Sequence, residues 1–299
     1  MPIENLAGRS VADFRLVERI GEGGTATVYK AEQSDGSICA VKILRERFRR
    51  DETAVKRFLR EAGYGARVDH RSVARTYKYG EADDLYYLAL EWVNGVPLSK
   101  YISSAGRIDP PVVADIVGQI AGAIDASHAA GIIHRDLKPD NIMYDPETHT
   151  AKLLDFGIAR DAQLDPADRL TRAGFFVGTL QYVAPEALSG ELVGESADTY
   201  SLAKITYHML TAASPHQGGS PRELFQQLLQ ADPIPLNQAV RGVRFPAALA
   251  TAVMRGLARR PADRQPTVLD FARQVAESAS QEPGGSRILE RVKALFARD

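Results

Sequence analysis

Short runs of alternating apolar and polar residues dominate the first ninety residues of the chain. A two-residue period is typical of half-buried β-strands. It predicts five strands, over residues 14–20, 26–32, 37–44, 73–80 and 85–91. Because the runs are short and close together, we expect them to pair antiparallel, with turns at Asp35-Gly36 and Asp83-Asp84.

Helical periodicity first appears after residue 50 and then dominates the rest of the chain. Val55, Phe58, Ala62 and Ala66 have the spacing of one helix face, which predicts a helix between the third and fourth strands. Further helices are predicted over residues 110–130, 196–211, 222–230, 246–258 and 267–279.

The change of pattern near Asn94-Gly95 predicts an α+β fold with two lobes. The expected domains are a β-rich small lobe with one helix (residues 1–93) and a mostly helical large lobe (residues 94–280). A linker and an amphipathic C-terminal helix follow (residues 281–299). That helix could dock on its own domain, pair with a partner or lie on a membrane surface.

The composition is that of an ordinary globular protein, with 44% hydrophobic and 25% charged residues. A net charge of -1 gives no basic field for nucleic acid. The single cysteine, Cys39, excludes an internal disulfide, and its place in a predicted strand favours burial. We find no signal peptide and no membrane-spanning apolar run, and therefore expect a cytoplasmic protein.

A glycine-rich turn, GEGG at residues 21–24, separates the first two predicted strands. Its glycines would let backbone amides approach a phosphate closely. A dinucleotide-binding motif needs a helix after the glycines, and a P-loop ends in Gly-Lys-Ser/Thr, so the turn fits neither. By itself it is equally compatible with an ordinary hairpin.

Lys42 shares one face of the third predicted strand with Ile38 and Ala40. A flat ring could lie on Ala40 while the ammonium group of Lys42 reaches phosphates. Taken alone, Lys42 is better explained as a surface lysine whose stem covers apolar atoms. Glu61, on the predicted helix, could be its carboxylate partner.

A polar segment, HRDLKPDN at residues 134–141, follows the small and apolar AAGII. Pro139 keeps the segment out of a helix, so that its side chains can converge. Asn141 offers an amide oxygen and Asp155 a carboxylate, and Mg²⁺ accepts such ligands beside substrate phosphates. Asp136 is then left to accept a proton from an attacking hydroxyl.

These motifs occur in the order of one known set. The chain resembles the bacterial eukaryotic-like (Hanks-type) Ser/Thr protein kinases from about residue 14 to residue 278. The matching features are the glycine hairpin, AVK, HRDLKPDN, DFG, APE at residues 184–186, Asp198 and Arg264. The resemblance implies Mg²⁺- and ATP-dependent transfer of a phosphate to Ser or Thr hydroxyls of protein substrates.

The resemblance also implies a role for each site residue. Asp136 would be the catalytic base, and Lys138 would neutralise the transferred phosphate. Asn141 and Asp155 would bind Mg²⁺. The remaining residues would bind ATP, with Lys42 and Glu61 forming an ion pair at its phosphates: Gly21, Glu22, Gly23, Gly24, Val28, Ala40, Lys42, Glu61, Glu91, Val93 and Met143.

Further residues have expected structural roles. Glu186 and Arg264 should form a buried ion pair, and Asp198 should cap the backbone of the polar segment.

Thr171 is the expected autophosphorylation site. Between Asp155 and Glu186 the chain has no serine and only two threonines, Thr171 and Thr179. Thr179 should be occupied by contacts in the substrate groove. A phosphate on Thr171 would pair with Arg135. A homodimer would allow the reaction to occur in trans.

Several positions depart from the family pattern. Ala26 replaces a third glycine, and Lys204 stands where relatives often have an apolar residue. Gly65 and Thr76 replace bulky apolar residues that would link the lobes, which reduces the apolar surface packed there. We therefore expect the helix that carries Glu61 to be held loosely and basal activity to be low.

The alternative function is a pseudokinase-like scaffold that binds nucleotide and a partner protein. The five residues needed for transfer are present and favour the enzyme: Lys42, Asp136, Lys138, Asn141 and Asp155. A small-molecule kinase is disfavoured by the APE segment and Arg264, which build a peptide groove in protein kinases.

Overall fold

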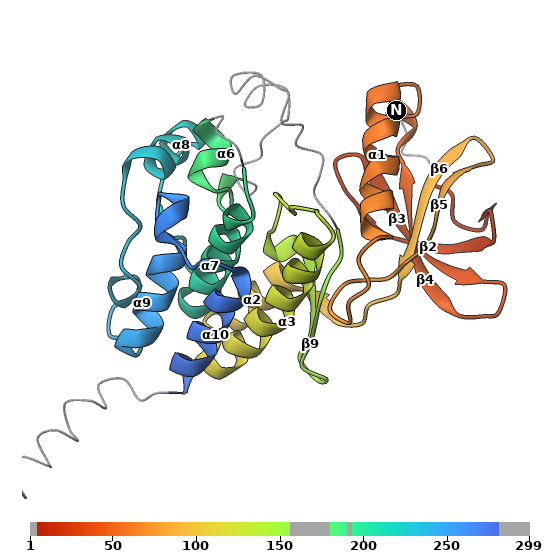
Figure 1. Cartoon of the computed structure of the whole chain (residues 1–299). Helices are drawn as coiled ribbons and strands as arrows, with labels where there is room; N and C mark the ends of the chain where they lie inside the picture. The colour runs from red at the N-terminus through yellow and green to blue at the C-terminus, as the bar shows by residue number, and fades with distance from the viewer. Residues whose placement is uncertain (1–4, 156–179, 190–192, 281–299) are drawn as a thin grey trace, which may run out of the picture.

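The computed structural model describes residues 5–155, 180–189 and 193–280 of the chain. A lobe built around one sheet lies beside a larger lobe built mainly from helices (Figure 1). This arrangement confirms the predicted α+β, bilobal fold.

The small lobe is built on a six-stranded antiparallel sheet with the order β1-β2-β3-β4-β6-β5. Its strands are β1 (Ser10–Val11), β2 (Phe14–Glu22), β3 (Ala26–Gln33), β4 (Ile38–Leu44), β5 (Thr76–Ala82) and β6 (Leu85–Glu91). The five strands predicted from alternation are confirmed, and the two-residue β1 was not predicted. Asp83 and Asp84 form the β5–β6 turn with φ values of 52° and 61°, a conformation that Asp tolerates better than most residues.

Helix α1 (Glu52–Gly65) packs across this sheet. Asp51 caps its first turn by accepting hydrogen bonds from the backbone N–H groups of Thr53 and Ala54. Most of the predicted apolar face is confirmed: Phe58 and Ala62 are buried in one cluster with side chains of β4 and β6, and Val55 packs against it. Ala66 is exposed, because the helix ends at Gly65.

Within its described residues, the large lobe contains six longer helices and a short one. They are α2 (Leu98–Ala105), α3 (Pro110–Ala129), α6 (Pro185–Ser189), α7 (Ser196–Thr211), α8 (Pro221–Gln230), α9 (Ala247–Gly256) and α10 (Val268–Ala279). The five helices predicted in this region are confirmed to within about two residues at their ends, the ordinary uncertainty of such boundaries. Helices α2 and α6 were not predicted.

The core of the large lobe surrounds α3. This helix is buried along most of its length and contacts α7, α10 and β9 (Thr150–Leu153). Strand β9 belongs to a small antiparallel sheet with β8 (Ile142–Asp145) and β7 (Val96–Pro97). Four single-turn 3-10 helices complete the described elements: η1 (Glu46–Phe48), η2 (Pro139–Asn141), η3 (Leu236–Gln238) and η4 (Pro261–Asp263).

Backbone hydrogen bonds join β9 to the segment that precedes β5. The N–H of Ala74 donates to the carbonyl of Leu153 (2.8 Å), and the N–H of Leu153 donates to the carbonyl of Ser72 (2.8 Å). Asp155 follows Leu153 by two residues, so these bonds position it near the small lobe.

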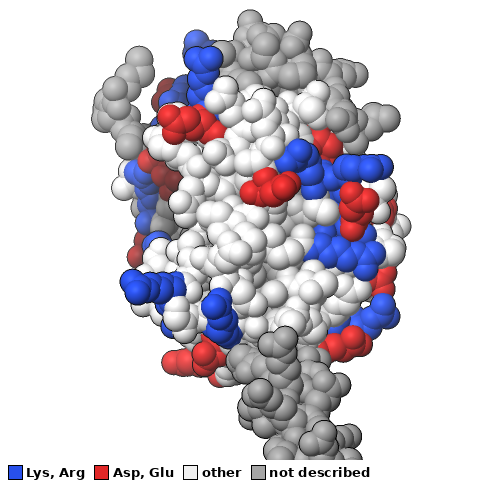
Figure 2. All heavy atoms as spheres, turned by 90° about the vertical axis from the view of Figure 1, so that its left-hand side faces the viewer, with Lys and Arg blue, Asp and Glu red and all other residues white. Residues whose placement is uncertain are grey.

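Charged side chains are mixed on the outer face of the large lobe. Basic and acidic groups alternate around a central uncharged area on the face shown in Figure 2. This face therefore carries no extended patch of one sign. Among the helices of the described ranges, none is long and apolar enough to cross a membrane.

Candidate active site

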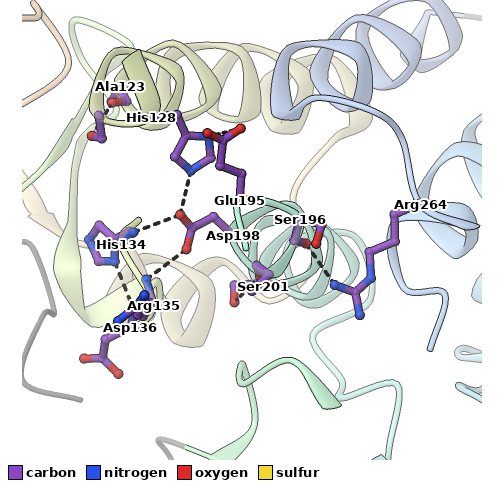
Figure 3. Close-up of polar contacts among 12 residues, drawn as sticks. Ala123, His128, His134, Arg135, Asp136, Glu195, Ser196, Asp198, Ser201 and Arg264 are labelled. Atoms are coloured by element: carbon purple, nitrogen blue, oxygen red, sulfur yellow. Dashed lines mark hydrogen bonds and ion pairs between the residues drawn. The ribbon is translucent and has the colours of Figure 1, made fainter. Parts of the chain in front are cut away.

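Asp198 holds the polar segment in place from the first turn of α7. Its carboxylate is fully buried and accepts hydrogen bonds from the backbone N–H groups of His134 and Arg135, both at 2.9 Å (Figure 3). The Nε2–H of His128 donates to the same carboxylate at 2.8 Å. The predicted capping role of Asp198 is confirmed, whereas His128 was not anticipated.

This anchor fixes an unusual backbone conformation. Arg135 has φ of +62°, which is unfavourable for a residue with a side chain unless its surroundings enforce it. The next residue, Asp136, is turned back, so that its N–H donates to the carbonyl of His134 at 2.8 Å. The orientation of Asp136 therefore depends on the carboxylate of Asp198, which holds the two residues before Asp136.

Asp136, Lys138 and Asn141 converge as predicted. The Nζ of Lys138 lies 2.7 Å from Oδ2 of Asp136. The Nδ2 of Asn141 donates to the main-chain carbonyl of Asp136 at 3.0 Å, so the amide oxygen of Asn141 is the atom left for a metal. The main-chain N–H of Leu154 donates to the carbonyl of Asn141 (2.9 Å), which brings Asp155 next to this group.

Lys42 reaches this group from the small lobe. Its ammonium forms an ion pair with the carboxylate of Asp155, 113 residues further along the chain. Both side chains are partly buried. The structure thus brings Lys42, Asp136, Lys138, Asn141 and Asp155 together.

The expected ion pair between Lys42 and Glu61 is absent, which corrects that prediction. No ion pair of Glu61 occurs among the described residues, because Lys42 lies on Asp155 instead. Burial, and then the charge of Asp155, raise the pKa of Glu61 to about 7, although Lys42 acts in the opposite direction. The pairing depends on the position of α1 relative to β4, which sequence spacing does not determine.

Two arginines contact the glycine turn at residues 21–24, and these contacts were not predicted from the sequence. Glu22 pairs with Arg45 at 2.7 Å, and Arg47 donates to the carbonyl of Gly24 at 3.1 Å. A methyl group added at Gly21 or Gly24 would meet nothing within 4 Å, so the space beside the turn is open to a ligand. A cluster of arginines directly after the third predicted strand was the signal in the sequence.

The residues predicted to surround adenine lie on two sheets, with Val28 and Ala40 on the small-lobe sheet and Met143 on the small sheet of the large lobe. Val28 pairs with Lys42 in the β3–β4 register, and Ala40 pairs with Leu90 in the β4–β6 register. Met143 lies on β8, paired with Lys152 of β9.

Glu91 and Val93 lie at the end of β6 and just after it. The N–H of Glu91 already donates to the carbonyl of Arg75 at 2.8 Å, so a nucleotide would have to use the carbonyl of Glu91. The side chain of Glu91 also pairs with Lys152.

The predicted Glu186–Arg264 pair is confirmed as a buried, two-pronged interaction. Its two nitrogen–oxygen distances are 2.7 and 2.8 Å, and both side chains are almost fully buried. Arg264 also donates to the carbonyls of Ser196 (2.9 Å) and Ala258 (2.8 Å), so its donors are well satisfied.

Asn141 and Asp155 form the donor set for a metal. One amide oxygen and one carboxylate fit Mg²⁺, which keeps several waters and takes further oxygens from phosphates. A cluster of three or more His, Cys, Asp or Glu side chains suited to a metal does not occur in the part of the chain that the structure describes. Phe156, Gly157, Thr171 and Thr179 lie outside the described residues.

The two lobes and the polar residues that meet between them define a protein kinase fold. Comparison with known proteins agrees: the protein kinase domain model matches residues 14–277. The chain therefore belongs to the protein kinase domain family.

Its relatives include bacterial kinases. Serine/threonine-protein kinase PknH of Mycobacterium bovis is 36% identical over 278 residues, which are 93% of this chain and 46% of PknH. The chain spans about half the length of the curated relatives it matches. The resemblance to bacterial Hanks-type Ser/Thr kinases is thus confirmed.

Solved structures agree with the fold. The kinase domain of Mycobacterium tuberculosis PknI aligns with a TM-score of 0.70 and 28% identity, over 92% of this chain and all of that domain. Rad53 residues 1–466 in complex with AMP-PNP align with a TM-score of 0.71 and 28% identity, over 88% of this chain and 64% of Rad53.

Proposed function

We propose that the protein is an active Ser/Thr protein kinase that uses Mg²⁺ and ATP. The observation that carries the proposal is the convergence of Lys42 and Asp155 with Asp136, Lys138 and Asn141. A scaffold that only binds nucleotide would have no need for Asp136 and Lys138 to be held at 2.7 Å from each other. The Rad53 complex with AMP-PNP supports nucleotide binding by this fold.

Each of these residues has a task in the proposed reaction. Asp136 accepts the proton of the attacking Ser or Thr hydroxyl. Lys138 offsets negative charge on the transferred phosphate while it remains beside Asp136. Asn141 and Asp155 would hold Mg²⁺, which when bound neutralises charge on the phosphates and orients them.

ATP would be bound mainly by residues of the small lobe. Gly21, Glu22, Gly23 and Gly24 would cover its phosphates, and Val28, Ala40, Glu91, Val93 and Met143 would enclose the adenine. The Asp155 carboxylate cannot bind a metal freely while it is paired with Lys42. Full activity therefore requires Lys42 to leave Asp155 and pair with Glu61. The arrangement described here therefore supports low basal activity.

The test is phosphate transfer by the purified full chain. Labelled ATP, Mg²⁺ and a generic protein substrate should give phosphoserine or phosphothreonine. Asp136→Asn should lower the rate by about 10²–10⁴-fold, the usual contribution of a general base. Lys42→Met should also abolish transfer. Asp232→Asn and Lys56→Met, at exposed positions with no role in the proposed site, are the matched controls and should retain activity.

The scaffold alternative makes a distinct prediction. A shift in melting temperature with AMP-PNP, combined with no transfer to any substrate and no autophosphorylation, would support a scaffold and contradict the proposed enzyme.

We further propose that protein substrates and a second copy of the chain are its partners, and that it acts in the cytoplasm. A homodimer would phosphorylate Thr171 in trans, and the new phosphate would pair with Arg135. Mass spectrometry after incubation with ATP should find phosphate on Thr171, and Thr171→Ala should reduce activity. An unmodified Thr171 in active protein would contradict this assignment.

A further inference from the structure

The segment between β4 and α1 carries an excess of positive charge. Residues 45–50, with the sequence RERFRR, contain four arginines and one glutamate, which is a net charge of +3 in a chain whose net charge is -1. Glu46, Arg47 and Arg50 are exposed. A local excess of one sign attracts ligands of the opposite sign. The proposed phosphate transfer gives these arginines no task.

This segment lies beside the glycine turn. The backbone N–H of Arg45 donates to the carbonyl of Thr25 at 2.9 Å, and the guanidinium of Arg47 donates to the carbonyl of Gly24 at 3.1 Å. Arg45 follows Lys42 by three residues of extended chain, which span about 10 Å. The arginines therefore border the residues that the proposed function assigns to the phosphates of ATP.

The acidic residues nearby neutralise only part of this charge. Glu22 forms ion pairs with both Arg19 and Arg45, so one carboxylate is shared by two guanidinium groups. Asp51 accepts hydrogen bonds at the start of α1, and Glu52 pairs with Lys56. Neither of these two carboxylates pairs with an arginine of residues 45–50.

Arg47 and Arg50 keep most of their donors available. Arg47 uses one donor on Gly24 and lies over the ring of Phe48, 4.6 Å from its centroid, and no carboxylate of the described residues pairs with it. Arg50 forms neither a hydrogen bond nor an ion pair with any described residue. Because a guanidinium has several N–H donors and accepts no hydrogen bond, both side chains suit an acceptor that carries negative charge.

We propose that Arg47 and Arg50 form a recognition surface for acidic protein substrates, whose Glu or Asp side chains beside the target Ser or Thr pair with the two guanidinium groups. The inference rests on the proposed function, in which the glycine turn covers the phosphate to be transferred and a substrate approaches it. Guanidinium groups bind carboxylates through parallel N–H···O bonds, so arginine suits this task better than lysine.

The first test compares three peptides that carry the same serine, flanked by glutamates, by glutamines or by lysines. Because an exposed ion pair changes affinity by up to about fivefold, two arginines should give the glutamate peptide a kcat/KM about tenfold above that of the glutamine peptide. The lysine peptide should be the poorest substrate. Raising the salt from about 0.05 M to about 0.5 M should reduce the preference, because exposed charges are screened.

Substitutions assign the preference to the two arginines. Arg47→Gln combined with Arg50→Gln should bring the glutamate and glutamine peptides to within about twofold of each other. Arg47→Lys combined with Arg50→Lys keeps the charge and should retain most of the preference. Arg260→Gln, whose side chain is 80% exposed on the large lobe, is the matched control and should retain all of it. A weaker hold on ATP would slow all peptides alike, so the ratio between peptides is unaffected by it.

Two results would overturn the proposal. One is a wild-type protein without a preference for the glutamate peptide, or a Gln double variant that keeps the preference. The other is an equal loss of rate on all three peptides in the Gln double variant. The arginines would then serve the chain itself, through the glycine turn or through a phosphate on Thr171.

Peptide binding separates this inference from the proposed function. Fluorescence anisotropy with labelled peptides in which alanine replaces the serine reports affinity in the presence of AMP-PNP and Mg²⁺, without phosphate transfer. Tighter binding of the glutamate peptide to wild type, lost in the Gln double variant, would support the surface even if no transfer occurs. Transfer to all three peptides at equal rates would leave the kinase function standing and overturn the surface.

Discussion

The side chain of Glu61, on α1, is partly buried, and the charged groups that act on it belong to the candidate active site. A carboxylate in such a place favours its protonated form unless a cation is paired with it. Lys42 is near enough to influence the pKa of Glu61, but its ion pair is made with Asp155. Glu61 is therefore held at some cost to stability at neutral pH.

This cost should depend on pH. The pKa of Glu61 is raised from 4.5 to about 7, so the folded state keeps a proton that the unfolded state has lost between these values. The stability contributed by protonated Glu61 is present below pH 4.5 and is lost as pH rises through 7. Glu61→Gln should therefore gain about 1–3 kcal/mol relative to wild type between pH 5 and pH 8.

Urea unfolding at the two pH values measures this gain. Glu52→Gln, on the same helix with an 86% exposed side chain, is the control and should show no such change. An equal difference between Glu61→Gln and wild type at both pH values would contradict the interpretation.

Helix α7 holds the catalytic segment, residues 134–141, in position. Its first turn carries Asp198, which accepts hydrogen bonds from the backbone N–H groups of His134 and of Arg135, the residue with positive φ. Asp198→Ala should leave these groups unsatisfied and cost about 2–4 kcal/mol. Transfer activity should fall by at least tenfold, because Asp136 follows the bend directly.

A comparison of Asp198→Ala and Asp198→Asn sharpens this prediction. Asn can still accept one of the hydrogen bonds and should retain part of the stability, measured by chemical unfolding. Full activity in Asp198→Ala would contradict this interpretation, because the conformation at Arg135 would then not depend on Asp198.

The pair of Glu186 and Arg264 joins α6 to the chain between α9 and α10. Arg264→Met should cost about 3–5 kcal/mol, because Glu186 would remain buried without a partner. Combining Arg264→Met with Glu186→Leu should recover a large part of that loss in urea unfolding. A double variant as unstable as the sum of both single variants would contradict a direct pairing.

Long periodic elements and the catalytic residues could be predicted from the sequence. Helix α7 and strand β4 show their periods over seven residues or more, and the HRDLKPDN segment carries its chemistry in contiguous residues. In contrast, α2 (Leu98–Ala105) is short, and β7 has only two residues, so neither has a readable period.

Features set by tertiary packing could not be predicted. The partner of Lys42 depends on the position of α1 relative to β4. The roles of Arg45 and Arg47 depend on how the chain after β4 approaches the glycine turn. In each case the residue types are plain in the sequence, but their neighbours come from distant segments.

Contacts between described residues connect the small lobe to the large lobe. They include the ion pair between Lys42 and Asp155 and the β-bridge between Val73 and Leu153. A ligand that binds both sides should stabilise the fold as a unit. With Mg²⁺ and AMP-PNP at 100 times the dissociation constant, we expect about 2.7 kcal/mol of stabilisation.

Thermal unfolding with and without this ligand measures the effect. Lys42→Met should lose most of the response at the same concentrations, whereas the exposed control Lys56→Met should keep it. An equal response in Lys42→Met would place nucleotide binding away from Lys42.

The single thiol of the chain, Cys39, lies in the middle of the small-lobe sheet on β4. It is completely buried, and burial, then the charge of Asp35, raise its pKa to about 11. Alkylating and disulfide reagents attack only accessible thiolates, so they should spare the native protein. The rate at which they modify Cys39 therefore reports transient unfolding around the small-lobe sheet, without any engineered label. If bound nucleotide slows thiol modification less than it slows global unfolding, the small lobe unfolds locally without the large lobe.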